Sequence, residues 1–283
     1  MSHTRALSTA TAALLGGEWQ GQVKKLYVVG LGFSEDVYAA LESLCGLNRG
    51  DGSIENIGGS DRYATALEVY RKLRTLQEED GAESAPVMSS VIVATGLKSA
   101  DALAVSAVSY RYHIPILLAK SGGRVTEETL AAVTDNDHIF ALGAESCVSD
   151  TVEEAARRVR GETLDYHRLY GDNRYATSLA IADFFDSEAF YAYTPAVLYG
   201  GLLGIADGTD SHFPDSLAAG QLLGRLGGSL LLQNEKNNTC VTAYFRNNRE
   251  LLLSEIRDWQ FYGSAAADTA SSICRRVMAD ILG

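Results

Sequence analysis

The chain has 283 residues, of which 46% are hydrophobic and 21% charged, with 27 glycines and only 4 prolines. This composition is typical of packed globular units, and the length suits two or three domains. The net charge of −12 argues against a nucleic-acid partner, because neutralising phosphates requires a basic surface. No apolar run approaches the roughly 18 residues of a transmembrane helix, so membrane insertion is not expected.

The first 53 residues predict a helix, a strand and a second helix. Residues 7–14 begin with hydroxyl side chains that can cap a helix, and residues 26–30 form a short apolar run that suits a buried strand. A second helix is expected over 34–41, with acidic residues in its first turn, where the helix dipole favours them. The N-terminus lacks the long apolar core of a secretory signal.

A nine-residue segment then occurs twice. Residues 59–67 read Gly-Ser-Asp-Arg-Tyr-Ala-Thr-Ala-Leu, and residues 171–179 read Gly-Asp-Asn-Arg-Tyr-Ala-Thr-Ser-Leu, with six identical positions. Each copy precedes an amphipathic run, and Arg62 and Arg174 lie 112 residues apart. The chain is therefore a tandem array.

Each copy of the segment is followed by a strand, a helix and a strand. In the first copy these are residues 91–96, 100–108 and 114–119, and in the second 202–208, 214–219 and 228–233. Both central helices are expected to be buried, since 100–108 is apolar nearly all round. Apolar strands that alternate with helices predict parallel sheets with helices on both faces.

A helix–strand–helix pattern closes each copy. It occurs over 126–133, 138–143 and 149–155, and more weakly over 241–245, 259–263 and 267–271. Residues 7–41 show the same pattern, so it occurs three times, whereas the Arg-Tyr-Ala-Thr segment occurs twice. We therefore expect an incomplete copy at 1–53 and complete copies at 54–165 and 166–283.

The order and spacing of these segments resemble the cell wall binding repeat of type 2, found in surface proteins and autolysins of Gram-positive bacteria. The resemblance implies small three-layer α/β modules, each a short, mostly parallel sheet flanked by helices, packed in a pseudo-threefold array. It also implies non-covalent anchoring to an anionic cell-wall polysaccharide or teichoic-acid-like polymer at the cell surface. The chain itself would have no catalysis, and an effector domain would lie elsewhere in the full protein.

An alternative from the same resemblance is that this region targets an amidase-type autolysin or a surface protease whose catalytic domain lies outside the chain. The residues themselves offer little for catalysis. Asp61 could act as an acid or base beside Arg62 and Tyr63, but its counterpart is Asn173, and an amide can cap a helix without acting as a base. We therefore expect a capping role at this position.

The two arginines allow two interpretations. Arginine in a first helical turn opposes the helix dipole, which suggests a fixed partner, and Asp101 and Asp215 are the acids kept in both copies. Alternatively, Arg62 and Arg174 face a groove and bind the polymer.

The other residues of the repeated segment have local roles in this interpretation. Tyr63 and Tyr175 are expected to pack against the sheet with the hydroxyl at its rim, and sugar stacking is the alternative. Thr65 and Thr177 are expected to bond back to the backbone.

An acidic chain that binds an anionic polymer must concentrate its cations locally. The candidates for this, besides the two arginines, are Lys98, Arg111, Lys120, Arg124 and Arg168. No metal or cofactor is expected. The acids and the histidine of the loop 207–215 are interpreted as solvated, and Cys45, Cys147, Cys240 and Cys274 as isolated thiols.

Overall fold

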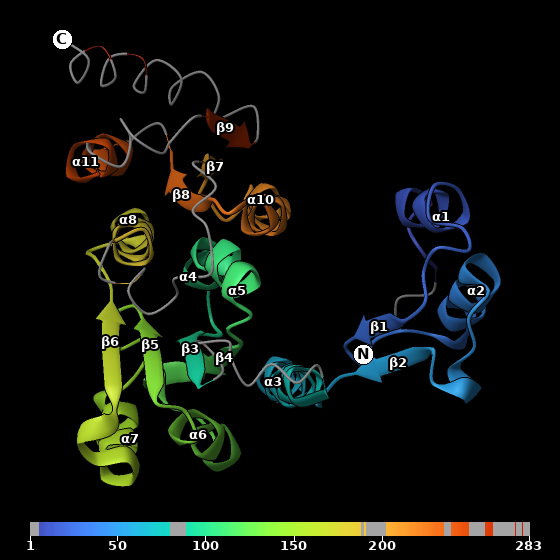
Figure 1. The fold of residues 1–283 in the computed structure, drawn as a ribbon, viewed down its shortest axis with the longest axis horizontal. Helices are drawn as coiled ribbons and strands as arrows, with labels where there is room; N and C mark the ends of the chain where they lie inside the picture. The colour runs from blue at the N-terminus through green and yellow to red at the C-terminus, as the bar shows by residue number, and fades with distance from the viewer. Residues whose placement is uncertain are drawn as a thin grey trace. The chain divides into compact units, whose positions relative to one another are not determined.

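The computed structural model describes residues 6–79, 89–187, 190, 202–234, 239–248, 258–262, 275 and 279. These residues form helices and three short parallel sheets (Figure 1). The chain divides into two compact units, Met1–Lys72 and Leu73–Gly283. The predicted class, small α/β modules with parallel sheets flanked by helices, is confirmed. The pseudo-threefold arrangement and the module boundaries stay predictions.

The N-terminal unit has a two-stranded sheet in which β1 (Leu26–Val29) runs parallel to β2 (Ile54–Ile57). Two helices, α1 (Thr9–Gly16) and α2 (Glu35–Cys45), pack together beside it, and the Ser8 side chain caps α1 as expected. Their apolar faces meet the sheet in a small core of Leu15, Val28, Val37, Tyr38, Leu41, Cys45 and Ile54. The last helix of this unit, α3 (Arg62–Glu79), continues into the second unit.

The C-terminal unit contains the two larger sheets. The central sheet has the order β4-β3-β5-β6, with strands Ile116–Ala119, Ser90–Thr95, His138–Leu142 and Asp165–Leu169. Its helices are α4 (Ala100–Ala104), α5 (Ser106–Tyr112), α6 (Glu127–Thr134) and α7 (Asp150–Arg160). Every residue of β3 is buried, as a continuous apolar strand in a parallel sheet requires.

The last sheet repeats the first three strands of this pattern. Its order is β8-β7-β9, with strands Ser229–Gln233, Leu202–Asp207 and Asp258–Tyr262. Its helices are α8 (Arg174–Phe185), α10 (Phe213–Leu226) and α11 (Thr239–Asn247). The strands predicted at 202–208, 228–233 and 259–263 are thus confirmed. The helix predicted at 267–271 and Cys274 lie outside the described residues.

Two strands were not predicted, β2 and β6. Each opens a sequence repeat, yet each pairs with the closing strand of the repeat before it: Leu26 lies opposite Ile54, and His138 lies opposite Asp165. The β6 strand escaped prediction because four of its five residues are only partly buried and most are polar. The boundaries of the sequence repeats therefore do not coincide with the boundaries of the sheets, because the first strand of a repeat belongs to the sheet of the preceding repeat.

A continuous core joins the two sheets of the C-terminal unit. Phe140 of β5 packs edge to face on Phe185 of α8, with ring centroids 5.0 Å apart. The helices α5 and α10 cross closely, because a Cβ added to Gly220 would lie 1.8 Å from the Ser106 Oγ. Gly220 and Ser106 occupy equivalent positions in the two copies. The two modules therefore contact each other through equivalent helices.

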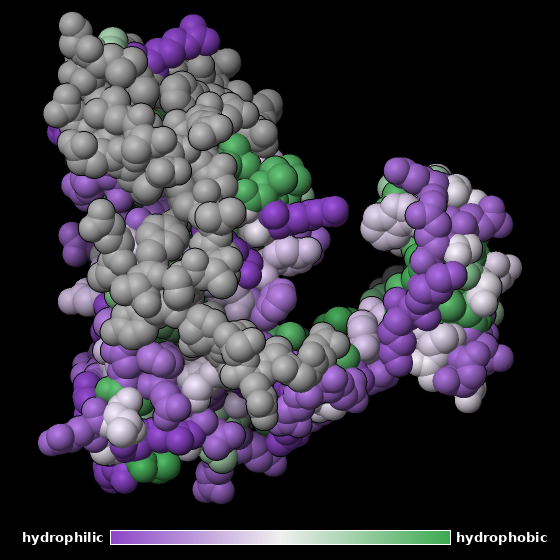
Figure 2. Space-filling model, viewed as in Figure 1, coloured by the Kyte–Doolittle hydropathy of each residue, from purple (hydrophilic) through white to green (hydrophobic). Residues whose placement is uncertain are grey.

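The two central helices differ from expectation. The helix expected at 100–108 is two short helices separated by Val105, with the Ser106 hydroxyl donating to the Leu103 carbonyl, a bond that bends helices. The helix expected to be buried at 214–219 is buried on one face only, and Leu217 is 50% exposed. That prediction was wrong for the outer face of α10, over which Figure 2 shows hydrophobic atoms next to hydrophilic ones.

The residues that end α5 and α10 offer a matched test of backbone strain. His113 takes a left-handed conformation with φ of 53°, and its equivalent Gly227 has φ of 75°. We expect His113→Gly to stabilise the fold by up to about 1 kcal/mol, and Gly227→Ala to destabilise it by about 1–2 kcal/mol, because only glycine adopts this conformation without strain. Urea denaturation of both variants measures this, and shifts of the same sign would contradict it.

A buried carboxylate docks α11 onto α8. Asp186, the C-cap of α8, accepts hydrogen bonds from the Ser229 and Tyr244 hydroxyls at 2.7 Å each. Burial raises the pKa of Asp186 to about 6, against the hydrogen bonds and the charge of Arg111 that oppose the shift. Nearby, Asp183 accepts hydrogen bonds from the side chains of two asparagines of the α11 end, and burial raises its pKa as well.

This pKa predicts a pH dependence of stability. A carboxyl whose folded pKa of about 6 exceeds the usual 3.8 favours folding when protonated, so its contribution is lost as the pH rises from about 4 to about 6. We expect Asp186→Asn to remove this loss and to raise the unfolding midpoint at pH 7. Urea unfolding between pH 4 and pH 7 checks this, with the exposed Asp172→Asn as control. An unchanged pH profile for Asp186→Asn would contradict it.

Candidate functional site

The repeated segment builds the same turn in both copies. A Cβ added to Gly59 or to Gly171 would lie 2.4 Å from the Cβ of the alanine five residues later, so the chain passes too close to the helix for any side chain. The Thr65 hydroxyl accepts a hydrogen bond from the Gly59 N–H at 3.1 Å, and the Thr177 hydroxyl does the same for Gly171 at 3.2 Å. The glycine, alanine and threonine of the segment thus fix the entry into the helix.

Both caps form as predicted. The Asp61 carboxylate accepts from the Ala64 N–H at 2.8 Å, and the Asn173 side-chain oxygen accepts from the N–H groups of Tyr175 and Ala176 at 3.0 and 3.1 Å. An aspartate and an asparagine perform the same task, which supports capping instead of acid–base chemistry at this position.

Arg174 has a different partner from the one expected. Its Nη1 donates to the Gly208 carbonyl at 2.7 Å and pairs with Asp210 at 2.5 Å, so the fixed partner is Asp210 and not Asp215. The hydrogen bond and the charge of Arg174 lower the pKa of Asp210. The sequence concealed this partner because Asp210 lies in a loop that is longer than its counterpart after β3 and so has no equivalent there.

The predicted Arg62–Asp101 pair stays a prediction. Arg62 is exposed in the N-terminal unit, and Asp101 belongs to the other unit. Burial raises the pKa of Asp101, and the positive charges of Arg174 and Lys98 oppose this shift. A Cβ on Gly143 would lie 3.2 Å from the Asp101 carboxylate, which places this acid where the carboxyl ends of β3 and β5 meet.

Tyr175 packs as expected. It is 7% exposed, and its hydroxyl accepts a hydrogen bond from the Asn234 side chain at the end of β8. Tyr63, in the first copy, is partly buried. The burial of Tyr175 leaves its ring no face for sugar stacking.

Two of the candidate binding cations donate hydrogen bonds to backbone carbonyls. Arg168 donates to the carbonyls of Gly143 and Val148 at 3.1 and 2.9 Å and pairs with Asp150 at 2.7 Å. Arg111 donates to the Gly227 carbonyl at 3.1 Å, across the boundary between the two sheets. Both guanidinium groups therefore tie loops together.

The remaining three cations lie at the carboxyl edge of the central sheet. Lys98 follows β3, and Lys120 and Arg124 flank the short turn after β4; all three are exposed. The two loops are neighbours, because Thr95 at the end of β3 lies opposite Ala119 at the end of β4. The Lys120 N–H donates to the Arg124 carbonyl at 2.7 Å, which closes the second loop. In open parallel sheets, ligands bind beyond this edge.

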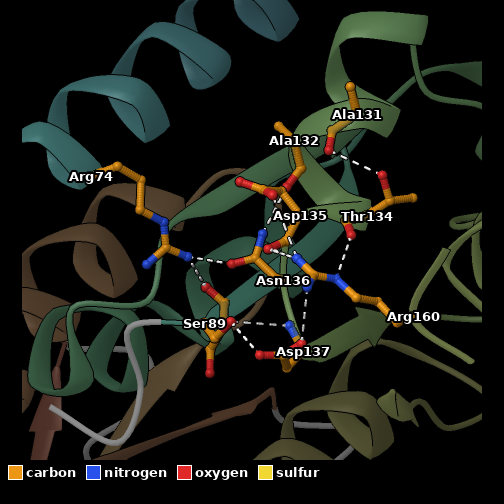
Figure 3. Close-up of polar contacts among 10 residues, drawn as sticks. Arg74, Ser89, Ala131, Ala132, Thr134, Asp135, Asn136, Asp137 and Arg160 are labelled. Carbon is orange, nitrogen blue, oxygen red and sulfur yellow. Dashed lines mark hydrogen bonds and ion pairs between the residues drawn. The ribbon is translucent and has the colours of Figure 1, made fainter. Parts of the chain in front are cut away.

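The opposite edge carries a polar network that the sequence did not reveal (Figure 3). Arg74 of α3 donates to the Ser90 carbonyl at 2.7 Å and to the Asn136 side chain, and Ser89 donates to Asp137 at 2.8 Å. Arg160 of α7 donates to the Thr134 carbonyl at 2.8 Å. These bonds satisfy the ends of helices and strands, so the network fastens α3 and α7 to the sheet.

Within the described residues, no group of three or more acidic, histidine or cysteine side chains could hold a metal ion, and no helix could span a membrane. The loop after β7 is internally bonded, since Asp207 accepts from the Thr209 N–H at 2.7 Å. Cys45, Cys147 and Cys240 are free thiols, and burial raises the pKa of Cys45 and Cys240.

The model of a protein family, cell wall binding domain 2 (CWB2), matches residues 56–153 and 168–274, which is well over half of the chain. The chain belongs to the CWB2 family. The two matched regions correspond to the two copies of the Arg-Tyr-Ala-Thr segment and the strands and helices that follow them. The resemblance inferred from the repeats is thereby confirmed, and the chain is a cell wall binding protein module.

Relatives show the same fold within larger proteins. The chain is similar to Cwp8 from Clostridium difficile (TM-score 0.69, 18% identity, 91% of this chain and 39% of that one) and to Cwp6 from the same organism (TM-score 0.62, 19% identity, 87% and 34%). It is also 24% identical over 155 residues to the N-acetylmuramoyl-L-alanine amidase LytC of Bacillus subtilis, covering 54% of this chain and 27% of the amidase. The chain thus spans well under half the length of each.

The contacts of Arg174 predict a structural role. Arg174→Lys keeps the charge but loses the planar fork, so we expect a loss of about 1–2 kcal/mol of stability with wall binding preserved below the melting temperature. Thermal melts and co-sedimentation with cell walls measure the two quantities, with the exposed Arg158→Lys as control. Loss of wall binding at unchanged stability would instead place Arg174 in a ligand groove.

Proposed function

We propose that the chain anchors a protein to the outside of the bacterial cell by binding an anionic polymer of the cell wall, without catalysis of its own. The CWB2 family is a cell wall binding family, which supports attachment. The binding surface is the carboxyl edge of the central sheet, around Lys98, Lys120 and Arg124.

The exposure of these three cations is the observation that carries this assignment. Lys98, Lys120 and Arg124 are exposed on two adjacent loops, whereas Arg111, Arg168 and Arg174 are partly buried and donate to backbone carbonyls. The net charge of −12 does not prevent binding, because charges beyond about 8 Å are screened at physiological salt. A local cluster can therefore attract an anionic polymer although the whole chain is acidic.

A triple variant tests the surface. We expect Lys98→Gln, Lys120→Gln and Arg124→Gln together to weaken binding to Gram-positive cell walls by roughly 100-fold, at about 1 kcal/mol per cation. Co-sedimentation at several salt concentrations measures this. Wild-type binding should weaken with salt more steeply than binding of the variant.

A control variant removes three exposed arginines elsewhere, Arg71, Arg157 and Arg158, and should bind nearly as the wild type does. Walls stripped of secondary polymers should release the wild-type chain. Equal binding to stripped peptidoglycan would contradict the polymer proposal, and equal losses in the two triple variants would contradict the surface.

A second candidate function is targeting of a cell-wall hydrolase. The similarity to the amidase LytC favours this function. The matched region makes up 27% of the length of that amidase. In this proposal the chain delivers a catalytic domain to the wall, and the binding chemistry is unchanged. The sequence adjoining residues 1 and 283 in the complete gene product tests it: an amidase or protease domain there supports targeting, and its absence contradicts it.

A further inference from the structure

The central sheet has a topological switch point between β3 and β5. In the order β4-β3-β5-β6, β3 connects through α4 and α5 to one side of the sheet, and β5 connects through α7 to the other side (Figure 1). The two connections therefore part where the carboxyl ends of β3 and β5 lie together. In open parallel sheets, ligands bind beyond the strands at such a point. The residues at this point are therefore candidates for ligand contact, beside the cations of the same edge.

Asp101 is the acid at this switch point. A Cβ on Gly143, the residue directly after β5, would lie 3.2 Å from the Asp101 carboxylate. Asp101 is partly buried, yet within the described residues of the C-terminal unit no hydrogen bond or ion pair engages its side chain. A carboxylate that is partly buried without such a partner costs free energy, so its position requires an explanation.

The helix dipole does not explain the position of Asp101. An acid in a first helical turn stabilises a helix when the dipole favours the charged carboxylate, which lowers its pKa. Burial instead raises the pKa of Asp101, against the positive charges of Arg174 and Lys98. The fold therefore disfavours the charged form. The second copy repeats the acid as Asp215 in the first turn of α10, also partly buried. An acid that is kept against the preference of the fold is typical of a binding group.

A hydroxyl group is the ligand chemistry that suits Asp101. An ionised carboxylate accepts hydrogen bonds and donates none, so it binds hydroxyl donors and repels anionic groups. Lys98 is exposed three residues earlier on the same loop, and its charge acts on Asp101. The two side chains together can therefore hold an anionic group of a polymer next to one of its hydroxyl groups.

An exposed aromatic ring lies at the same edge of the sheet. Tyr170 follows β6 directly and is 54% exposed. The charge of Arg174, four residues further on, acts on Asp101, so the loop that begins with Tyr170 lies near the acid. Neighbouring strands are about 4.8 Å apart, which puts the ends of β4 and β6 about 14 Å from each other. An exposed tyrosine can pack against the apolar face of a sugar ring.

We propose that the carboxyl edge of the central sheet recognises the sugar units of the wall polymer as well as its charge. Asp101 accepts a hydrogen bond from a sugar hydroxyl, and the sugar ring packs on Tyr170, while Lys98, Lys120 and Arg124 hold the anionic groups. This inference rests on the proposed function, since it assigns the ligand of the same surface as a glycan and not as a plain polyanion. The polymer then runs across the strand ends from β4 toward β6.

Neutralising Asp101 tests the proposal by the sign of its effect. A purely electrostatic surface should bind an anionic polymer more tightly when a nearby negative charge is removed. We expect Asp101→Asn instead to weaken binding to Gram-positive cell walls about 10-fold at pH 7, because a charge-assisted hydrogen bond becomes a neutral one. Co-sedimentation of the full chain measures this.

The matched control is Glu145→Gln, which removes an exposed acid from the loop after β5. It should bind walls as tightly as the wild type or more tightly. Binding by Asp101→Asn that equals or exceeds that of the wild type would overturn the proposal and leave the proposed function standing. Failure of the wild type itself to bind walls would overturn both.

Urea unfolding distinguishes a binding role of Asp101 from a structural one. Because burial raises the pKa of Asp101, the charged form is disfavoured in the fold at pH 7, and Asp101→Asn should not lower the unfolding midpoint. Weaker wall binding by a variant as stable as the wild type identifies a ligand contact. A lowered midpoint would instead support the ion pair with Arg62 that the sequence predicts, and would overturn the proposal.

Two further measurements test the sugar itself. Tyr170→Ala should weaken wall binding about fivefold, whereas Tyr170→Phe, which keeps the ring, should bind as the wild type does. Soluble polymer extracted from the same walls should displace the wild-type chain at lower concentration than inorganic polyphosphate of equal charge, and Asp101→Asn should lose this preference. Equal displacement of the wild type by the two polyanions would overturn the proposal, and this result depends on no variant.

Discussion

Parallel pairing between the closing strand of one repeat and the opening strand of the next is the constraint on which the architecture depends. In the register of β5 and β6, His138 lies opposite Asp165 and Leu142 opposite Leu169, so the chain leaves one sheet directly into the helix that begins the next module. That helix must then start within a few residues of the sheet. The glycine, cap and threonine of the repeated segment fix this start, and the Arg174 contact with Gly208 and Asp210 fixes where the helix lies on its own module.

This arrangement separates residues that hold the array together from residues that are open to a ligand. The guanidinium groups of Arg111, Arg168 and Arg174 bind carbonyl oxygens in the loops between elements, where the backbone would otherwise lack donors. The cations of the loops after β3 and β4 are exposed instead, and a hydrogen bond between the Lys120 and Arg124 main chains closes the second loop. Binding of an acidic chain to an acidic polymer then depends on a local cluster and falls with salt.

Much of the fold could be predicted from the sequence, and the failures have physical reasons. Apolar strands such as β3 and β7, and caps such as Asp61 and Asn173, depend on local residues, and these predictions are confirmed. The strand β6 was missed because its polar, partly buried residues lack an apolar run. The partner of Arg174 and the exposure of α10 depend on loop length and on neighbouring modules, which no local pattern encodes. Arg111 and Arg168 were candidate ligand contacts because charge alone does not distinguish a backbone clamp from a binding group.

Hydrogen exchange with and without purified wall polymer tests the central claim most directly, that the repeated Arg-Tyr-Ala-Thr segment is an architectural joint and the polymer binds at the carboxyl edge of the central sheet. The account predicts that bound polymer slows exchange in the loops 96–99 and 120–124, while the amides of the segment at 171–178 and of α7 exchange as in the free protein. Protection confined to residues 171–178, with unchanged exchange in the two loops, would contradict it.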